Sequence, residues 1–101
     1  MTPKLVRDLI PEIIKENAEI PHTHIADEKE FWEELKKKLQ EEVEEFIKDE
    51  TIEELADINE VLLAIYEHKN ISAEEVESIR EQKANKRGGF KKRIILERMN
   101  G

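Results

Sequence analysis

Apolar residues recur every three or four positions over three long stretches of the chain, which is the spacing of one face of an α-helix. Each stretch follows a short polar residue with glutamate three positions later, the pattern of a helix-capping box. The three boxes are Asp27 with Glu30, Thr51 with Glu54, and Ser72 with Glu75. They predict helices over residues 28–48, 52–69 and 73–86. Because the connections are short, we expect an antiparallel helical hairpin followed by a further helix.

The segments outside these helices carry weaker signals. Residues 4–11 are expected to be extended or to form a single turn, and Pro11 is expected to open a short helix over residues 11–17. Residues 20–26 should form a loop. Residues 90–96 should form a strand or a last helix, since periodicity does not decide between the two.

Length and composition indicate one small all-α domain. The chain has 101 residues, so we expect a single domain over residues 1–101. Charged residues make up 42% of it and aromatic residues only 5%, so the core must be thin. Only three glycines and three prolines are present, which favours long helices over loops. A chain with so thin a core gains stability by oligomerising, and a homodimer or homotetramer is expected.

The charge is divided between two regions of the chain. Its net value of -8 argues against general nucleic-acid binding. Residues 41–60 hold ten carboxylates and one base, whereas from Lys83 onward seven basic residues face one acid. One region therefore suits cations and the other anions. The absence of cysteine excludes a thiolate metal site and suits a reducing compartment. No apolar run approaches a membrane span and the N-terminus lacks a signal-peptide core, so we expect a cytoplasmic protein without a membrane partner.

Four carboxylates lie on or beside the apolar stripes of the first two long helices. At about 100° per residue, Glu42 falls in the middle of its stripe and Glu45 at the edge, about 60° away. Residues within about 60° of Glu42 are Phe31, Leu35, Leu39 and Phe46. On the next helix Glu54 lies in the stripe, and Asp57 is about 60° to one side. Residues within about 40° of Glu54 are Ile58, Val61 and Ile65.

An antiparallel hairpin brings these carboxylates level with one another. In such a hairpin, two residues lie level with one another when their residue numbers add up to a constant. The numbers of Glu42 and Asp57 add up to the same total as those of Glu45 and Glu54. Glu42 should therefore face Asp57, and Glu45 should face Glu54, on two successive helical turns. Four anions in an apolar interface need cations or protons. Oxygen ligands suit Mg²⁺ or Mn²⁺, and Mg²⁺ often completes its shell with substrate phosphates. Two simpler interpretations remain: Glu54 only completes its capping box, and the others only form a charged helix face.

Three motifs resemble those of the MazG-like all-α nucleoside triphosphate pyrophosphatases. The acidic pattern EEVEEF over residues 41–46 followed by ELAD over residues 54–57 is similar to the EExxE and ExxD signature of that superfamily. The N-terminal KLVRDLIP over residues 4–11 and the later Lys83, Arg87, Gly88, Gly89 and Phe90 resemble its small single-domain house-cleaning branch, which is phosphoribosyl-ATP pyrophosphohydrolase-like.

The resemblance implies a four-helix-bundle-type fold, usually completed by oligomerisation. It implies that Mg²⁺ is bound by Glu42, Glu45, Glu54 and Asp57, and that the bond between the α- and β-phosphates of a nucleotide is cleaved. Glu41 matches the leading acid of the motif, yet the projection puts it outside the stripe, so it is expected to support the ligands or act as the base. The spacer between Glu45 and Glu54 is shorter than in typical members, which leaves substrate identity open.

Hydrolysis of an anhydride also needs cations that hold the phosphates. Lys38 lies one turn before Glu42, where it would bind a substrate phosphate or pair with that carboxylate. Lys83 and Arg87 lie one turn apart at the end of the last long helix, where positive charge is also stabilising for the helix itself. The resemblance favours phosphate binding by Lys83, Arg87 and Arg7.

Other chemistry-bearing residues receive simpler interpretations. His22 and His24 fall in a predicted loop without cysteine nearby and are expected to be incidental. Trp32 and Tyr66 adjoin the apolar stripes and are expected in the core or at a subunit interface, with stacking on a base as the alternative. The basic run 91–93 is expected to be solvated surface.

The sequence therefore predicts a Mg²⁺-dependent nucleoside triphosphate pyrophosphohydrolase that releases monophosphate and pyrophosphate, including from non-standard nucleotides. One alternative is phosphoribosyl-ATP hydrolysis in histidine biosynthesis. The other is a non-enzymatic helical interaction module, in which the acidic cluster is surface and the basic end binds an acidic partner.

Overall fold

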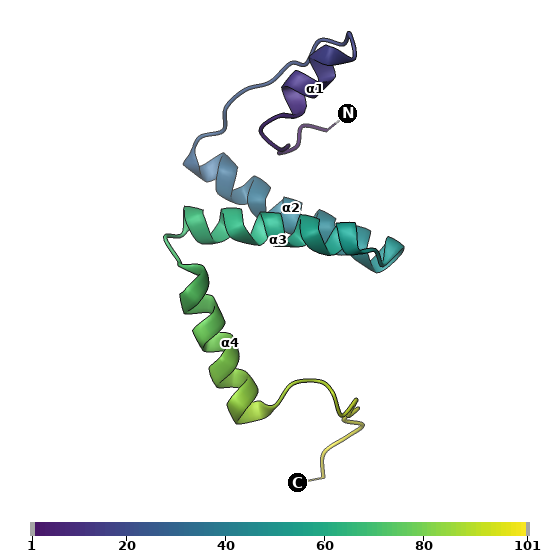
Figure 1. Ribbon diagram of the computed structural model, residues 1–101, viewed down its shortest axis with the longest axis vertical. Coiled ribbons are helices and arrows are strands. Elements are labelled where there is room, and N and C mark those ends of the chain that lie inside the picture. The colour runs from purple at the N-terminus through teal and green to yellow at the C-terminus, as the bar shows by residue number, and fades with distance from the viewer. Residues whose placement is uncertain (1, 101) are drawn as a thin grey trace.

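The computed structural model describes residues 2–100, in which the regular structure consists of four helices. They are α1 (Ile10–Glu16), α2 (Glu28–Asp49), α3 (Ile52–His68) and α4 (Ala73–Arg87) (Figure 1). The three long helices begin at the predicted residues and end within one residue of the predicted ends. The all-α fold class is thereby confirmed.

Side-chain caps explain where the long helices begin. The side chains of Asp27, Thr51 and Ser72 each accept a hydrogen bond from the backbone N–H three residues later. Glu75 completes a full box by accepting a hydrogen bond from the Ser72 N–H. Such caps satisfy backbone donors that have no partner inside the helix.

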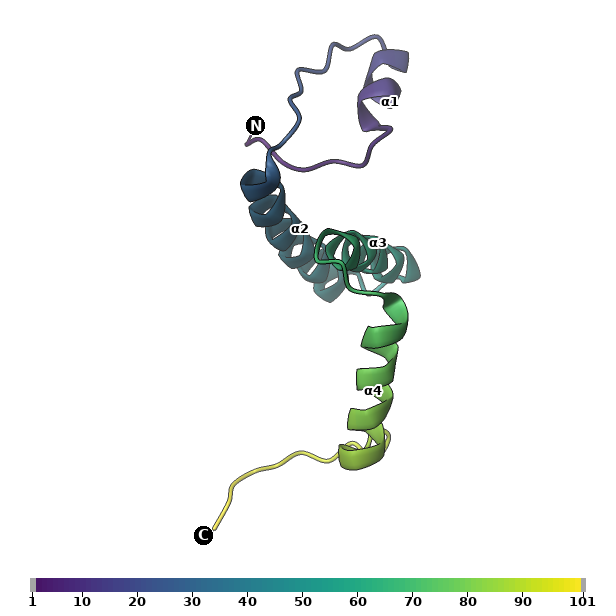
Figure 2. The ribbon, with the colours of Figure 1, turned by 90° about the vertical axis from the view of Figure 1, so that its left-hand side faces the viewer.

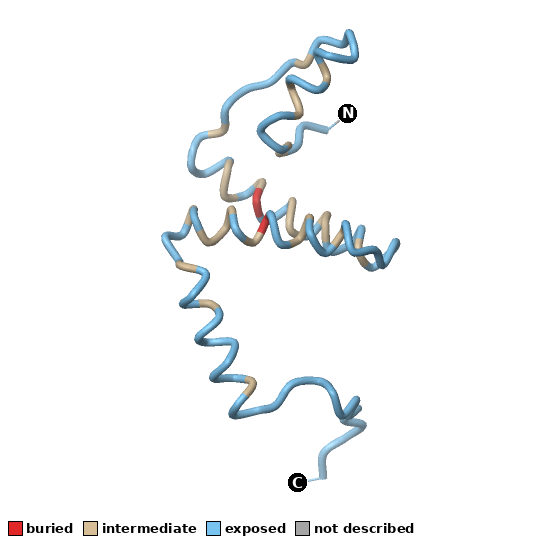
Figure 3. Tube along the Cα trace, in the orientation of Figure 1, coloured by how far each residue is buried: buried red, intermediate tan, exposed pale blue. Residues whose placement is uncertain are grey.

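Helices α2 and α3 form the predicted antiparallel hairpin. Two residues, Glu50 and Thr51, connect them. Glu50 takes a left-handed conformation with φ of 54°, and its N–H donates to the Phe46 carbonyl, which ends α2 sharply. Figures 1 and 2 both show α3 lying along α2. Leu35 and Val61 are the buried residues of the hairpin, with relative exposures of 2% and 8%. Figure 3 shows the buried segments in α2 and α3.

The chain as a whole is extended, because α1 and α4 do not pack along the hairpin. Its extents are 61 × 31 × 25 Å and its radius of gyration is 18.4 Å. A compact domain of about 100 residues has a radius near 13 Å. The described helices of one chain therefore do not make a four-helix bundle; what they make is a two-helix hairpin with one helix projecting from it. A bundle completed by oligomerisation stays a prediction.

The connection between α3 and α4 explains why α4 projects. Asn70 adopts φ of 56°, its N–H donates to the Glu67 carbonyl, and the Ile71 N–H donates to the Tyr66 carbonyl. These two bonds are those of a Schellman motif, which ends a helix. The Ser72 capping box starts the next helix one residue later. The hydrogen bonds that end α3 and those that start α4 thus define the direction in which α4 leaves α3.

The N-terminal part follows its prediction closely. Residues 2–7 have no regular structure, residues 8 and 9 form a turn, and Pro11 lies in the first turn of α1. Residues 20–26 form the predicted loop. None of the helices in residues 2–100 is long and apolar enough to cross a membrane.

The prediction for residues 90–96 is wrong. They form neither a strand nor a helix, and Phe90 and Ile95 are 98% and 82% exposed. A strand needs a neighbouring strand to pair with, and residues 2–100 contain none. The basic run 91–93 is exposed, as predicted.

The hairpin contact should dominate stability. Replacing Leu35 with Ala removes the most buried side chain, so unfolding should become easier by about 2 to 5 kcal/mol. Ile25→Ala is the control, because Ile25 is 96% exposed and its truncation should change stability by less than about 0.5 kcal/mol. Thermal and urea unfolding followed by circular dichroism measures both. Equal losses for the two variants would contradict this account of the core.

Candidate functional site

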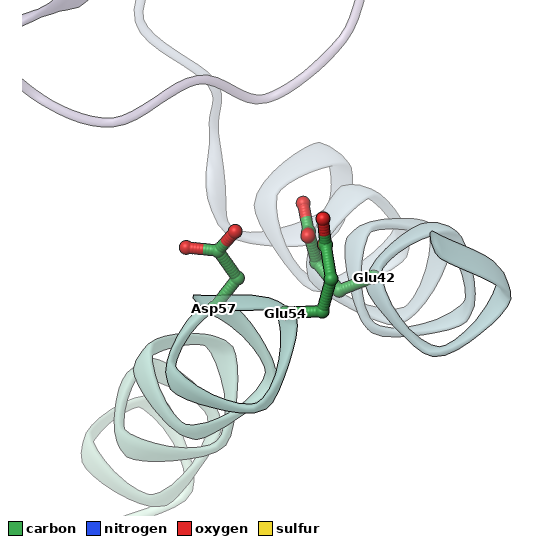
Figure 4. Close-up of side chains that lie close together, drawn as sticks. All are labelled: Glu42, Glu54 and Asp57. Atoms are coloured by element: carbon green, nitrogen blue, oxygen red, sulfur yellow. The ribbon is translucent and has the colours of Figure 1, made fainter. Parts of the chain in front are cut away.

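Carboxylates from α2 and α3 gather near the closed end of the hairpin. One group contains Glu42, Glu54 and Asp57, each half-buried, with one oxygen of each within 4.8 Å of the others (Figure 4). A second group contains Glu45, Asp49 and Glu54 on the same distance criterion. Glu54 belongs to both groups. The structure thus brings together the four acids that the sequence paired across the hairpin.

Asp49 is a member that the sequence analysis missed. It is the last residue of α2 and lies four positions after Glu45. Residues four apart share one face of a helix, so this spacing was a signal available in the sequence. With Asp49, the acidic cluster consists of Glu42, Glu45, Asp49, Glu54 and Asp57.

Partial burial and the crowding of negative charge both raise the pKa of Glu54. Its pKa is raised, first by partial burial and then by the charges of Glu45, Asp49, Asp57 and Glu42, in that order. Thr51 accepts a hydrogen bond from the backbone N–H of Glu54 at 3.4 Å. The carboxylate of Glu54 meanwhile lies within the acidic cluster. The backbone N–H of Glu54 therefore takes part in the helix cap, while its carboxylate stays free to bind a cation.

Cations from the N-terminal segment and α2 border the cluster. Arg7 Nη2 donates to Asp57 Oδ1 at 2.8 Å, across 50 positions of sequence. Lys38 Nζ lies 3.4 Å from Glu42 Oε1. A pocket of about 300 Å³ is lined by these four residues together with Lys4, Val6 and Ile10. Anionic and cationic groups thus share one pocket.

Glu41 lies on the flank of this arrangement. Its Oε1 is 3.7 Å from Lys38 Nζ and 3.9 Å from Lys4 Nζ. It belongs to neither carboxylate group, which agrees with a helical projection that puts it outside the apolar stripe. Lys4 is a second residue that the sequence analysis did not single out, although it begins the N-terminal motif.

Lys83 and Arg87 are not brought to the acidic cluster within this chain. Both are exposed on the C-terminal part of α4, which runs away from the hairpin (Figure 1). Neither lines the pocket that holds Arg7 and Lys38. Of the four predicted phosphate-binding residues, the structure therefore places two beside the acids and two apart from them.

The remaining aromatic and histidine residues lie elsewhere. Trp32 stacks on His68 with ring centroids 5.5 Å apart, and Lys69 Nζ lies 4.2 Å from the Trp32 ring. This contact joins the start of α2 to the end of α3, at the open end of the hairpin. His24 contacts Glu30 at 2.9 Å, and no histidine belongs to the carboxylate groups found in residues 2–100.

The donor set fits a small divalent cation. All donors in the cluster are carboxylate oxygens, the ligands that Mg²⁺ and Mn²⁺ prefer. Around Mg²⁺, adjacent ligand oxygens are about 3 Å apart and opposite ones about 4.2 Å apart, so oxygens within 4.8 Å of one another would have to approach by up to about 2 Å to share one ion. Arginine and lysine beside such a centre suit phosphate oxygens.

Comparison of the chain with protein-family models, with curated proteins and with solved structures finds no match.

Glu54 should make the metal-free protein more stable at lower pH. Its raised pKa means that the folded chain binds a proton more tightly than the unfolded chain. Stability should therefore rise as pH falls through the raised pKa towards the ordinary carboxyl range. Glu54→Gln removes this effect, so in EDTA the variant should melt above wild type near neutral pH, with an advantage that shrinks as the pH falls towards the ordinary carboxyl range.

Melting temperatures at a series of pH values measure this difference directly. Glu53→Gln is the matched control, because Glu53 is a neighbouring glutamate that is exposed and outside both carboxylate groups. An advantage of Glu54→Gln that grows on acidification would show that the carboxylate is not destabilised in the folded protein.

Proposed function

We propose that this protein is a Mg²⁺-dependent nucleoside triphosphate pyrophosphohydrolase. The observation that carries the proposal is the shared pocket, in which Glu42 and Asp57 lie beside Arg7 and Lys38. A triphosphate bound through a divalent cation needs this combination of anionic ligands and cationic phosphate contacts. The reaction gives a nucleoside monophosphate and pyrophosphate, from standard nucleotides and from non-standard or damaged ones.

Glu42, Glu45, Glu54 and Asp57 are the proposed ligands of Mg²⁺, with Mn²⁺ as a substitute. The bound ion would neutralise charge on the phosphates during the reaction. Asp49 lies within reach of Glu45 and Glu54 and would orient them. Glu41, on the flank of the cluster, is the proposed base for the attacking water, since it faces the same side of α2 as Lys38.

Arg7 and Lys38 have a double role in this proposal. In the structure each pairs with a carboxylate of the cluster, Arg7 with Asp57 and Lys38 with Glu42. Metal binding by those carboxylates would weaken both pairs, because the ion supplies the positive charge. The freed guanidinium and ammonium groups would then contact phosphate oxygens in the same pocket.

The motif resemblance supports the reaction class, and the short hairpin connection limits the substrate. The acidic signature, the N-terminal motif and the basic C-terminal motif all resemble those of MazG-like pyrophosphatases. Only Glu50 and Thr51 separate α2 from α3, so no insert is available there to contact a base. Homo-oligomerisation and a cytoplasmic location form part of the same proposal.

Phosphoribosyl-ATP is the alternative substrate, since the bond cleaved would again be the one between the α- and β-phosphates. Pyrophosphate release from a panel of nucleoside triphosphates, measured beside release from phosphoribosyl-ATP, separates the two. A non-enzymatic interaction module is the remaining alternative, and the exposed basic residues after Lys83 favour it. It predicts no effect of Mg²⁺ on melting temperature and no turnover.

Mg²⁺ should raise the melting temperature of wild type and support pyrophosphate release. Glu42→Gln should abolish the thermal shift and lower turnover at least about 100-fold, since even groups that only orient metal ligands contribute about 10- to 100-fold. Glu53→Gln should behave as wild type, because its side chain is exposed and outside the cluster. Differential scanning fluorimetry and a pyrophosphate assay read out the two effects.

Two results would each refute the metal centre. One is a wild-type protein whose stability and turnover do not respond to Mg²⁺ or Mn²⁺. The other is a loss in Glu53→Gln as large as that in Glu42→Gln, which would indicate a general charge effect.

A further inference from the structure

A second pocket adjoins the one that contains Glu42 and Asp57. It has a volume of about 370 Å³ and lies between the N-terminal segment and α2. The charged and polar residues that line it are Thr2, Lys4, Glu34, Lys37, Lys38 and Glu41. We call it the lysine pocket, after Lys4, Lys37 and Lys38, and we call its neighbour the cluster pocket. Lys4 and Lys38 line both pockets and form the boundary between them.

The N-terminal segment, which forms one wall of both pockets, is anchored on the hairpin. Arg7 Nη2 donates to Asp57 Oδ1 at 2.8 Å, three residues after Lys4. Leu5 and Val6, between these two cations, are half-buried. In Figure 4 the three labelled carboxylates point towards the side on which the N-terminal chain passes. The position of Lys4 is therefore set by the contacts of the residues that follow it.

The charges of Lys4 and Lys38 are only partly compensated. Glu41 Oε1 lies 3.9 Å from Lys4 Nζ and 3.7 Å from Lys38 Nζ. Glu42 Oε1 lies 3.4 Å from Lys38 Nζ. All three distances exceed the range of about 2.7–3.2 Å that is usual for a hydrogen bond. Since an ammonium group has three N–H donors, both lysines keep donors for an anion that enters between them.

Both ammonium groups approach one atom, Glu41 Oε1. A phosphate oxygen in the place of this atom would therefore contact Lys4 and Lys38 together. Phosphate carries more negative charge than a carboxylate and has more acceptor oxygens, so it would compete well with Glu41 for both. The side chain of Lys38 is only 19% exposed, which leaves its ammonium group little freedom to move away from the boundary between the pockets.

The lining of the lysine pocket favours a phosphate group over a nucleobase. Three lysines line it, and one of its two carboxylates, that of Glu34, already pairs with Lys37 at 3.0 Å. None of the described residues that line it is aromatic, whereas proteins commonly hold a base by stacking it on an aromatic ring. A small pocket with a surplus of ammonium groups suits an anion.

The sizes of the two pockets favour a ligand that extends over both. Small-molecule sites usually have volumes of about 300 to 1,000 Å³. The cluster pocket, at about 300 Å³, and the lysine pocket, at about 370 Å³, are each at the lower end of that range. A chain of phosphates that begins beside the acidic cluster would pass Lys38 and continue into the lysine pocket.

We propose that Lys4 and Lys38 hold the terminal phosphate of a triphosphate in the lysine pocket, while a cation at the acidic cluster contacts the phosphates next to the cleaved bond. Lys4 then distinguishes triphosphates from diphosphates, because a diphosphate has no third phosphate that reaches the lysine pocket. This preference rests on the proposed function, whereas anion binding in the lysine pocket does not.

Inorganic pyrophosphate tests the anion site without turnover, because it resembles the end of a triphosphate. With Mg²⁺ present, wild type should bind it in isothermal titration calorimetry. Lys4→Ala should bind it about 10-fold more weakly, since a charge-assisted hydrogen bond is lost. Lys4→Arg keeps the charge and should retain most of the affinity. Lys36→Ala is the control, because Lys36 lines neither pocket and, like Lys4, is a partly exposed lysine with a carboxylate partner.

The calorimetry separates the anion site from the reaction. A wild-type protein that does not bind pyrophosphate overturns the proposal, and so does an equal loss in Lys4→Ala and Lys36→Ala. Binding that depends on Lys4, in a protein that turns over no nucleotide, would refute the enzymatic proposal and support the anion site.

Selectivity between nucleotides tests the assignment to the terminal phosphate. Wild type should have a higher kcat/KM for a nucleoside triphosphate than for the corresponding diphosphate, and Lys4→Ala should lower this ratio about 10-fold. Thr2→Glu should also lower it, because Thr2 lines only the lysine pocket and a carboxylate there would repel the terminal phosphate. Thr23→Glu, the same change at an exposed loop residue that lines neither pocket, should keep the wild-type ratio. An active wild type whose ratio is unchanged in Lys4→Ala overturns the proposal and leaves the enzymatic one standing.

Discussion

The apolar contact between α2 and α3 forces negative charges together, and the arrangement of the candidate site depends on that constraint. Leu35 and Val61 are the buried residues of this contact. The two-residue connection leaves the helices one register in which to do so. In that register one carboxylate oxygen of each of Glu42, Glu54 and Asp57 lies within 4.8 Å of the others. Hydrophobic association thus supplies the free energy that holds like charges close to one another.

Opposite charge from outside the hairpin offsets part of this repulsion. Arg7 pairs with Asp57, and Lys38 pairs with Glu42. The exposed pair of Arg7 with Asp57 contributes only about 0 to 1 kcal/mol. Two cations beside five carboxylates do not relieve the cluster fully. The pKa of Glu54 is raised by its partial burial first and by the neighbouring carboxylates second. A site with uncompensated negative charge is one that attracts cations.

Local signals allowed the helices, the hairpin and its facing carboxylates to be predicted from the sequence. Capping residues such as Ser72 act within one helical turn. The short connection between α2 and α3 places Glu42 and Asp57 at the same height along the two helices. Residues 90–96 were harder, because a short apolar run has the same pattern in a strand and in a helix. Nor could the sequence place Lys83 and Arg87, since the direction of α4 depends on backbone hydrogen bonds around Asn70. Arg7 and Asp57 form an ion pair although they are 50 positions apart, and the periodicity of a sequence does not predict such a contact.

The sharp end of α2 at Glu50 also affects how the protein opens. Helices fray from free ends, and in this hairpin the free ends are those at Trp32 and His68. The carboxylates lie within a few turns of the connected ends, which the two-residue connection holds together. Amide exchange from partial opening should therefore be fast near the aromatic stack and slow near Phe46. The short connection thereby keeps the carboxylate geometry intact during motions that disorder the opposite end of the same two helices.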